Sequence, residues 1–467
     1  MKEKLTTVTK FVYGLGDFPT VAALTARSFF WLIFLTEIVG LRIEAAGIIV
    51  AIGRVWDAVN DPIVGMISDR LQSSLGRRRP FFLIGALPLG ISFFFSFYDP
   101  GLGSEAAYIA YYVIVFFVFD LSFTIINVPY SALTAELTQD YDERSSLAGW
   151  RMSMAMLATL ITAAAFKLLA DSVFSNWFDA PAPNAQGYAV AAAIWGSVMV
   201  IVPLILFMVI REPDSEPDDD SINFFKTFRE VFSNESFKWG AIVYLLTFTA
   251  VDIIAAIFIF FVIDALGFPD GQGIGSLFLG VVLLVAFLFM PVVVRLQHRY
   301  GKRKTYIYAM ASWAVVMLAI GFVPAGISFP LLLGIGAIAG LGYSAANAIP
   351  WAIVADVIEE DEWNTGKRRE GIYAGYLVFF RKLAAGLAVF LVTSTLGRLG
   401  FNEEVKSAES ITALRIFIGI VPAVLLFCSM WAANNYPLTK EKHAELVRKL
   451  QARRAARKAA PAIGDAV

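Results

Sequence analysis

Cysteine and histidine are almost absent from this sequence. The 467 residues include one cysteine, Cys428, and two histidines, His298 and His443. A single cysteine excludes a disulfide framework, and so few soft ligands exclude the usual Cys/His metal clusters. We also find no phosphate-binding loop, no dinucleotide fingerprint and no Ser/His/Asp set in a suitable context. We therefore predict a protein that is not an enzyme and that needs no cofactor.

Charged residues are scarce as well. They make up 16% of the chain, whereas soluble domains carry about a quarter. The formal net charge of −1 gives no reason to expect a nucleic-acid partner. The first ten residues lack the apolar core and cleavage site of a signal peptide, and neither end carries a lipidation motif.

Long apolar runs dominate what is present. Hydrophobic residues make up 58% of the chain, and runs long enough to cross a bilayer recur about twelve times. The predicted spans are roughly 12–38, 44–69, 79–98, 106–134, 147–170, 188–210, 238–264, 273–294, 305–324, 329–356, 371–397 and 411–434. We therefore predict an all-α membrane protein with twelve transmembrane helices.

An internal repeat divides the chain into two halves. Each half carries an Arg-Leu-Gln tripeptide followed by a glycine and a basic run: Arg70-Leu71-Gln72 with Gly76-Arg77-Arg78-Arg79, and Arg295-Leu296-Gln297 with Gly301-Lys302-Arg303-Lys304. Two six-helix halves in parallel repeat are typical of the major facilitator fold, which holds its solute near the membrane midplane. We predict an N-terminal half (1–210), a cytoplasmic linker (211–237), a C-terminal half (238–435) and a basic cytoplasmic tail (436–467).

The distribution of lysine and arginine predicts the orientation. These residues concentrate in the connections on one side of the predicted membrane and at both ends of the chain, whereas the other side carries Arg42, Arg398 and Lys406. The positive-inside rule then places both termini in the cytoplasm of a multi-pass cell-membrane protein. In the tail, Glu441 to Lys458 is compatible with an amphipathic helix on the cytoplasmic membrane face and equally with disorder.

The clearest functional signal is a charged cluster inside the second predicted span. Asp57 and Asp61 are four residues apart, so they lie on one face of a helix, with Asn60 beside them and Arg54 one turn earlier. A charge near the bilayer centre costs at least about 2.5–3.5 kcal/mol on insertion scales. The cluster predicts a cation site with oxygen ligands, or a proton acceptor. The alternative is a charge network that only holds helices together.

Polar residues of other spans extend this prediction. Thr124 and Asn127 share a helix face and suit Na⁺ or a solute hydroxyl, or else a bond to a neighbouring helix. Lys382 lies inside an apolar stretch of the second half and needs a counter-charge. We expect it to pair with Asp57 and Asp61, so that cation entry weakens the pair and couples ion occupancy to movement of the halves. The alternative is a fixed structural pair.

Several motifs together resemble the glycoside–pentoside–hexuronide:cation symporter family. They are Tyr13-Gly-Leu-Gly16-Asp17, Asp57-Ala-Val-Asn60-Asp61-Pro62, Gly76-Arg77-Arg78-Arg79-Pro80, Asn127-Val-Pro129-Tyr130 and Glu370-Gly371 with Phe380-Arg381-Lys382. The resemblance implies a major facilitator fold and symport of a solute with Na⁺, Li⁺ or H⁺. It places Asp57, Asn60, Asp61 and Thr124 at the cation, Lys382 as the positive partner between halves, and Arg151 near a sugar.

Departures from the family's sugar-binding pattern leave the solute open. The melibiose permease of this family carries aspartates and tryptophans at positions that read Val21, Asn127, Ser131 and Asn347 here, so its specificity does not carry over. The segment from Asn127 to Thr134, with Phe379-Phe380-Arg381-Lys382, also resembles the related sodium-dependent lysophospholipid transporters. A lysolipid or another amphipath is therefore the alternative to a sugar, and a uniporter, an exporter or a sensor is a third class.

For the solute site we predict six residues, which are Asp17, Asn127, Tyr130, Arg151, Asn347 and Trp351. For the coupling ion we favour Na⁺, bound at Asp57 and Asp61, over H⁺, because ionised carboxylates beside neutral oxygens suit a hard cation. The expected partners are the small-molecule solute and membrane lipid, and we expect the monomer to be the functional unit.

Overall fold

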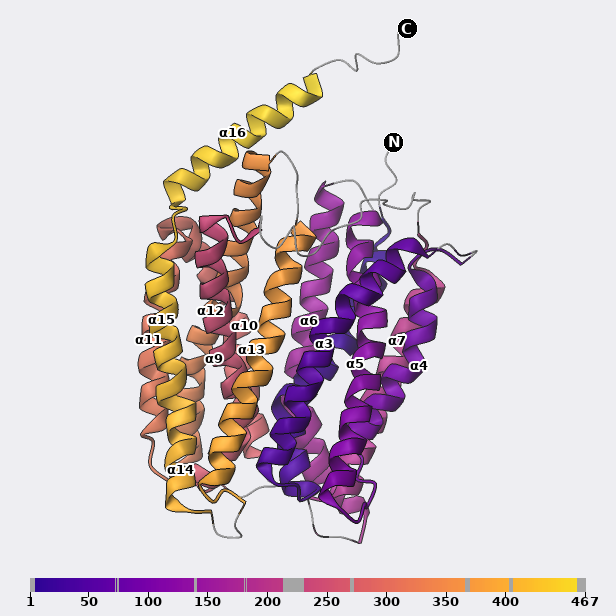
Figure 1. Ribbon diagram of the computed structural model, residues 1–467, viewed down its shortest axis with the longest axis vertical. Coiled ribbons are helices and arrows are strands. Elements are labelled where there is room, and N and C mark those ends of the chain that lie inside the picture. Colours follow the sequence, from indigo (N-terminus) through magenta and orange to yellow (C-terminus); the bar gives the residue numbers. More distant parts are fainter. Residues whose placement is uncertain are drawn as a thin grey trace.

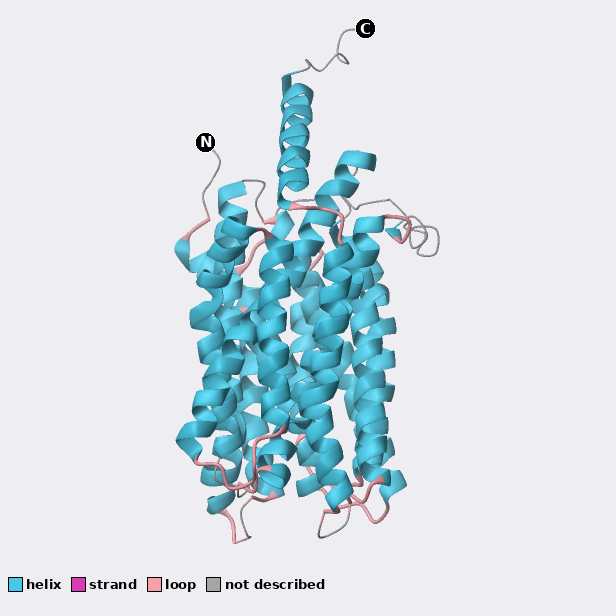
Figure 2. Cartoon of the chain, turned by 90° about the vertical axis from the view of Figure 1, so that its left-hand side faces the viewer, coloured by secondary structure: helices cyan, strands magenta, loops and turns pink. Residues whose placement is uncertain are grey.

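A computed structural model of the protein describes residues 5–71, 73, 75–137, 141–179, 181, 183–212, 231–268, 273–365, 370–402 and 406–459. In these ranges the chain forms helices joined by loops and turns, without a strand (Figure 2). The helices lie side by side in one elongated bundle, and the chain begins and ends at the same end of it (Figure 1). The all-α prediction is confirmed.

The first half of the chain contains the helices that carry the charged cluster. Its elements are α1 (Thr7–Leu15), α2 (Asp17–Ala26), η1 (Arg27–Trp31), η2 (Phe34–Ile38), α3 (Ile43–Arg70), α4 (Arg79–Ser96), α5 (Glu105–Glu136), α6 (Tyr141–Leu169), η3 (Ala170–Phe174), η4 (Ser175–Trp177) and α7 (Ala185–Val209). The segments η1, η2 and η3 are π-helical turns, a rare geometry that is frequent at functional sites.

The second half repeats this plan and adds one helix. Its elements are α9 (Glu235–Phe260), η5 (Phe261–Ala265), α10 (Ile274–Tyr300), α11 (Lys302–Gly321), α12 (Phe329–Thr365), α13 (Glu370–Arg398), α14 (Ala408–Arg415), η6 (Ile416–Ile420), α15 (Val421–Asn435) and α16 (Lys440–Ala459). The helix α16 covers the stretch from Glu441 to Lys458, which the sequence left open between helix and disorder, and it packs against α12.

Ten helical segments of the described chain are long and apolar enough to cross a membrane. They correspond to ten of the predicted spans, with bounds that agree to a few residues for α7 and α11. The other two predicted spans, 12–38 and 44–69, are also helical. The first is divided among α1, α2, η1 and η2. The second is α3, whose charged residues interrupt the apolar run but which packs inside the bundle against α5 and α13.

The two loops of the predicted repeat share a backbone feature. Gly76 and Gly301 have φ angles of 105° and 85°, in the region that glycine enters without steric cost. In the first half, Glu212 accepts hydrogen bonds from the backbone N–H groups of Arg77 and Arg78, at 2.7 and 2.8 Å. A Cβ at Gly301 would meet the Cβ of Lys440. Residues beyond the sixth helix of each half therefore pack against its basic loop. Most of the predicted linker 211–237 lies outside the described residues.

Contacts between the halves concentrate at the end of the bundle away from the chain termini (Figure 1). There α3 and α13 run antiparallel, and a Cβ at Gly47 would meet the Oγ1 atom of Thr393 at only 1.8 Å. Nearby, the side chain of Asn402 donates a hydrogen bond of 2.8 Å to Glu44. The halves are therefore packed closely together at this end.

Candidate cation site and solute cavity

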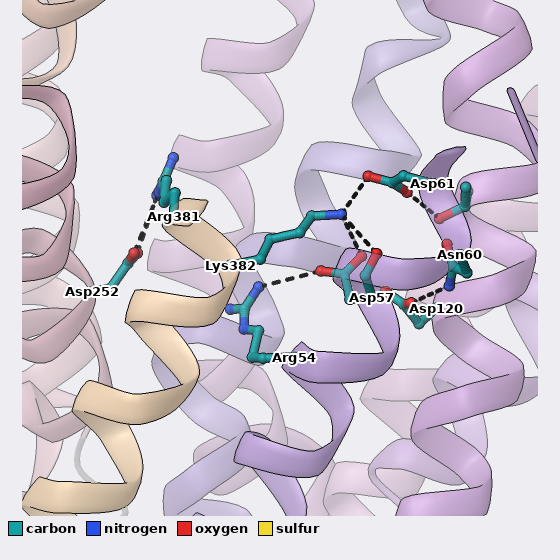
Figure 3. Close-up of polar contacts among 9 residues, drawn as sticks. Arg54, Asp57, Asn60, Asp61, Asp120, Asp252, Arg381 and Lys382 are labelled. Atoms are coloured by element: carbon teal, nitrogen blue, oxygen red, sulfur yellow. Dashed lines mark hydrogen bonds and ion pairs between the residues drawn. The ribbon is translucent and has the colours of Figure 1, made fainter. Parts of the chain in front are cut away.

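The side chain of Lys382 crosses from the second half to the first and contacts both predicted acids. Its Nζ atom lies 2.5 Å from Asp57 Oδ1 and 2.5 Å from Asp61 Oδ2 (Figure 3). Asp57 is only 5% exposed. The two acids lie on one face of α3, as their spacing predicts, and α13 brings the ammonium between them. One cation of the protein thus bridges two carboxylates of the opposite half.

Further polar and charged side chains complete this cluster. Thr124 on α5 donates a hydrogen bond of 2.8 Å to Asp61 Oδ1. The Nη1 atom of Arg54 lies 3.8 Å from Asp57 Oδ2. The amide nitrogen of Asn60 donates to Asp120 Oδ2. The structure therefore brings together every residue that the sequence assigned to the cation and its charge partners.

One acid of the cluster was not assigned to the site from the sequence. Asp120 lies on α5 and is 5% exposed. A signal for it was available, because Asp120 precedes Thr124 by four residues and therefore shares its helix face. The family resemblance placed Thr124 at the cation but gave no role to Asp120, so this acid was assigned no function from the sequence.

A small cavity connects the cluster to the second half. It is lined by Arg27, Arg54, Asp57 and Asp120 of the first half and by Asp252 of the second, together with apolar side chains. Arg27 is packed among aromatic rings, with its Cζ atom 3.9 Å from the centroid of the Phe116 ring, a cation–π geometry. The cavity therefore brings acidic and basic groups of both halves together.

Asp252 has its own partner within the second half. The guanidinium of Arg381 lies 3.0 Å from Asp252 Oδ1, and it also lies over the ring of Phe248 at 4.1 Å. Arg381 directly precedes Lys382 on α13. Adjacent residues of one helix thus form one ion pair within the second half and one across the interface (Figure 3).

Three residues predicted to bind solute are engaged with one another in the first half. Arg151 on α6 makes two bonds to Asp17, at 2.6 and 3.0 Å, and its Cζ atom lies 4.5 Å from the centroid of the Tyr130 ring. The Tyr130 hydroxyl donates to the backbone oxygen of Tyr13 at 2.6 Å. Asp17 is 8% exposed. This network joins α1, α2, α5 and α6, and a role in solute binding stays a prediction.

The other three predicted solute residues lie on α5 and α12. Asn127 is half-buried. Asn347 is half-buried too, and its amide nitrogen donates to the backbone oxygen of Tyr343 at 3.0 Å. Trp351 is 40% exposed, with its ring edge-on to Tyr244 at 5.0 Å. Each of these residues keeps part of its side chain accessible.

A second charged cluster, unforeseen from the sequence, joins α16 to the bundle. His443 Nε2 lies 2.7 Å from Glu359 and 3.1 Å from Asp356, both on α12. Lys302 lies 2.5 Å from the same oxygen of Asp356. The hydrogen bond to Glu359 raises the pKa of His443 above its ordinary value, against an opposing effect of partial burial. The cluster is an ion-pair network that holds the start of α16.

Comparison with known proteins gives the family. The sequence matches the family described as MFS/sugar transport protein over residues 12–440. The sodium-dependent lysophosphatidylcholine symporter 1 of Gallus gallus is 26% identical, covering 96% of this chain and 90% of its own. A proposed sulfoquinovose importer of Escherichia coli (strain K12) is 27% identical, covering 97% and 95%. The crystal structure of a nucleoside transporter has the same fold, with a TM-score of 0.67 at 12% identity over 91% of this chain and 99% of that one.

The family match confirms the predicted resemblance and the predicted fold. It covers both six-helix halves, including α3 and the helices that surround its charged cluster. It also identifies the chain as a multi-pass membrane protein rather than an enzyme. The bundle, the charged interface between its halves and the sequence match lead to one conclusion: this chain belongs to the MFS/sugar transport protein family, and it is a major facilitator transporter.

Proposed function

We propose that this protein is a secondary active transporter that couples entry of a cation, preferably Na⁺, to symport of a sugar or glycoside. The observation that carries the proposal is the bridge from Lys382 to Asp57 and Asp61. Both acids belong to one half and the ammonium to the other, so any cation that takes its place changes the contact between the halves.

The ligand set favours Na⁺. Carboxylates of Asp57 and Asp61, the hydroxyl of Thr124 and the amide oxygen of Asn60 are hard oxygen donors, which suit a hard cation. When Na⁺ replaces the ammonium, Lys382 loses its hold on the first half. Alternating access then follows, because the halves of such transporters rock about the site between them.

The membrane supplies enough energy for this coupling. One charge that moves down about 100 mV releases roughly 2.3 kcal/mol. At about 1.4 kcal/mol per tenfold ratio, this sustains a solute gradient of roughly fifty-fold. One cation moving down the membrane potential therefore supplies enough energy for concentrative uptake, and ATP is not required.

We further propose that both termini are cytoplasmic. The basic loops at Gly76 and Gly301 and the basic helix α16 lie at the end of the bundle where the chain begins and ends. Positively charged connections stay in the cytoplasm. The end at which Gly47 meets Thr393 is then extracytoplasmic, and the conformation is closed on that side.

A lysolipid is the second candidate solute, and one observation favours it. A pocket with almost wholly apolar walls lies within the second half, lined by α9, α10, α11 and α12, and Phe29 of the first half reaches its edge. Asp252 and Val251 are adjacent on α9, and they line the charged cavity and the apolar pocket respectively. A headgroup in the cavity with an acyl chain in the apolar pocket would use both. The sulfoquinovose importer named above supports a sugar-like solute. The lysophosphatidylcholine symporter named above supports a lysolipid.

Uptake into proteoliposomes tests the proposal. The purified protein is given a Na⁺ gradient or a proton gradient, with panels of sugars, sulfonated sugars and lysolipids. We expect Na⁺ to stimulate uptake of one class at least tenfold over choline, and Asp61→Asn to abolish the stimulation. Asp179→Asn, the same change at an exposed loop residue, is the matched control. Equal uptake with and without an ion gradient, or full Na⁺ stimulation in Asp61→Asn, would refute cation-coupled symport.

A further inference from the structure

The outer side of the second half carries a groove that the proposed transport mechanism does not use. It lies between α10, α11 and α12, which are all long and apolar enough to cross a membrane. In Figure 1 the helix α11 runs along the outer edge of the bundle. The volume of the groove is about 430 Å³, within the range of about 300–1,000 Å³ that is usual for small-molecule sites.

The walls of the groove are mainly apolar, and its rim is exposed. Val293, Trp313 and Ala345 are buried and line the groove. Tyr308 and Ile338 line it too, but they are 75% and 54% exposed. Because the three helices cross the membrane, a rim of this kind faces the bilayer. A ligand of the groove therefore enters from the lipid.

The groove covers the depth of one leaflet. Its lining on α11 runs from Thr305 to Val316, which is about 16 Å at a rise of about 1.5 Å per residue. The hydrocarbon core of a bilayer is about 30 Å thick, so one leaflet contributes about 15 Å. Since α11 begins at Lys302, at the basic end of the bundle, the groove starts near the membrane surface at that end.

The groove contains a polar group without a partner close to this surface. Thr305 lies in the first turn of α11 and is 7% exposed. Its hydroxyl has no hydrogen-bond partner in the part of the chain that the structure describes. Buried hydroxyls normally have one, and a threonine hydroxyl can donate a hydrogen bond. A phosphate or ester oxygen of a lipid would accept it at the depth where the headgroup meets the chains.

Positive charge lies at the same end of the groove. Arg299 follows Leu296 by three residues on α10, and Lys304 precedes Tyr308 by four on α11, so each cation shares a helix face with a residue that lines the groove. The Cζ atom of Arg299 also lies 5.2 Å from the centroid of the Tyr300 ring, which is part of the lining. Both cations are exposed and can contact an anion.

The neighbouring start of α16 leaves this charge positive. Glu441 interacts electrostatically with Lys304 and with Lys440, so α16 brings one acid and one base to this end of the groove. The Nζ atom of Lys440 donates to the backbone oxygens of His298 and Arg299, at 2.6 and 3.2 Å. Basic pockets between transmembrane helices on the cytoplasmic side bind anionic lipid headgroups.

We propose that the groove between α10, α11 and α12 binds one anionic phospholipid from the leaflet at the basic end of the bundle. One acyl chain lies along the apolar walls, an oxygen of the lipid accepts the hydrogen bond of Thr305, and the phosphate lies between Arg299 and Lys304. The groove belongs wholly to the second half, so the lipid stays bound while the halves move. The inference does not depend on which ion or solute is transported.

This lipid differs in place from a transported lysolipid. The apolar pocket described above and the groove are separate cavities, and Trp313 lines both. The ring of Trp313 is held by close packing against Gly342, where an added Cβ would meet its Cγ atom at 2.3 Å. A chain in the groove therefore supports a wall of the apolar pocket without entering it.

Lipid binding to the delipidated full-length protein in detergent tests the inference. Dioleoyl phosphatidylglycerol or dioleoyl phosphatidylcholine is titrated, bound lipids are counted by native mass spectrometry, and thermal unfolding is followed in parallel. The two lipids have the same chains and differ in the net charge of the headgroup. We expect one phosphatidylglycerol to bind at least tenfold more tightly than phosphatidylcholine and to raise the unfolding temperature. Salt should reduce this preference, because it screens exposed charges.

The variant Ser312→Trp fills the groove. Ser312 lines it and is exposed, and its hydroxyl donates to the carbonyl oxygen of Ala309 in its own helix, so the fold should tolerate the change. We expect the tightly bound phosphatidylglycerol to be lost. The matched control is Val315→Trp, at a position of α11 that is exposed and outside the lining of the groove. It should bind the lipid as the parent does.

The charge at the mouth is tested separately. In the double variant Arg299→Gln and Lys304→Gln, we expect the affinity for phosphatidylglycerol to fall to that for phosphatidylcholine, which itself should not change. Lys442→Gln, at an exposed position of α16, should keep the preference of the parent. Equal affinity of the parent for the two lipids, or phosphatidylglycerol binding in Ser312→Trp as tight as in the parent, overturns the inference.

Discussion

At the scale of single residues, the ammonium of Lys382 balances two carboxylates that would otherwise repel each other. Asp57 and Asp61 approach it equally closely, at 2.5 Å each. Removing one partner of a buried ion pair is costly because the remaining charge stays buried. Loss of Lys382 would leave carboxylates without their counter-charge, which is not the case for an ordinary surface lysine.

The variant Lys382→Ala should therefore be unstable in the absence of Na⁺. The loss expected for a broken buried pair is about 3–5 kcal/mol, and Na⁺ should restore more stability to the variant than to the parent, because it replaces the missing positive charge. Thermal unfolding in detergent, with NaCl compared against choline chloride, measures both effects. An identical Na⁺-dependent shift in parent and variant would contradict the idea that ammonium and Na⁺ occupy the same place.

A second residue-scale prediction concerns Arg151. Its bidentate contact with Asp17 and its position over the Tyr130 ring are a stabilising network, so Arg151→Ala should lower the unfolding temperature of the solute-free protein. Arg151→Lys should recover part of the loss, because lysine keeps the charge but not the fork geometry. If Arg151→Ala instead keeps its stability and loses only solute binding, the original assignment as a solute contact holds.

The sequence predicted which residues lie together where helical spacing alone decides their placement. The face shared by Asp57 and Asp61 follows from their separation alone. The involvement of Asp120, the pairing of Asp17 with Arg151 and the cluster around His443 depend on which helices are neighbours. One sequence holds no information on that point beyond the resemblance to a family.

At the scale of elements, hydropathy predicted where helices exist but not how far they extend. The predicted span 329–356 is part of α12, which continues to Thr365, because a helix that leaves the lipid turns polar without ending. The π-helical turns η1 and η2 within the first span were also missed, since apolar content does not indicate where such turns occur.

The helix α16 packs against α12, which extends beyond its predicted span. Leu446 and Leu450 are buried, and Arg453 donates to the backbone oxygen of Trp363 at 3.0 Å. Its contacts are therefore made with the extension of α12, and the sequence-based picture of a helix lying on the membrane face did not include them. The charged contact of His443 makes this docking depend on pH.

The sign of that dependence follows from the raised pKa of His443. A histidine whose folded-state pKa is raised contributes stability that is complete below its ordinary value of about 6.5 and is lost as pH rises through the raised value. We expect hydrogen exchange in α16 to be slow at about pH 6 and faster at about pH 9. In His443→Ala the exchange should be fast at both, apart from the intrinsic pH effect measured on the unfolded peptide. Equal protection of parent and variant would show that other contacts of α16, such as those of Leu446, Leu450 and Arg453, hold the helix without His443.

At the scale of the whole molecule, the close approach of α3 and α13 decides which end of the bundle is shut. Gly47 has no side chain, and a Cβ there would collide with Thr393. The resemblance of the two halves was visible in their basic loops, and the pairing of α3 with α13 was anticipated through Lys382. The sequence did not predict the end of the bundle at which the halves meet, because conformation is a property of the ensemble rather than of any motif.

Gly47→Val should therefore hinder closure at this end and reduce uptake at least tenfold while leaving Na⁺ binding measurable. Uptake in proteoliposomes and Na⁺ titration of the purified protein are compared with Gly334→Val, a helical glycine at which an added Cβ meets nothing within 4 Å. Parent-like uptake in Gly47→Val would mean that this contact is not part of the transport cycle.

The adjacency of Arg381 and Lys382 restricts how the ion site can be emptied. Neighbouring residues project about 100° apart around a helix, so a turn of α13 that withdraws Lys382 also pulls Arg381 away from Asp252. Twisting this helix on its own axis would therefore break two ion pairs at once. Exchange of ammonium for Na⁺ must proceed through the flexible carbon chain of the lysine, or through a tilt of the second half as one unit.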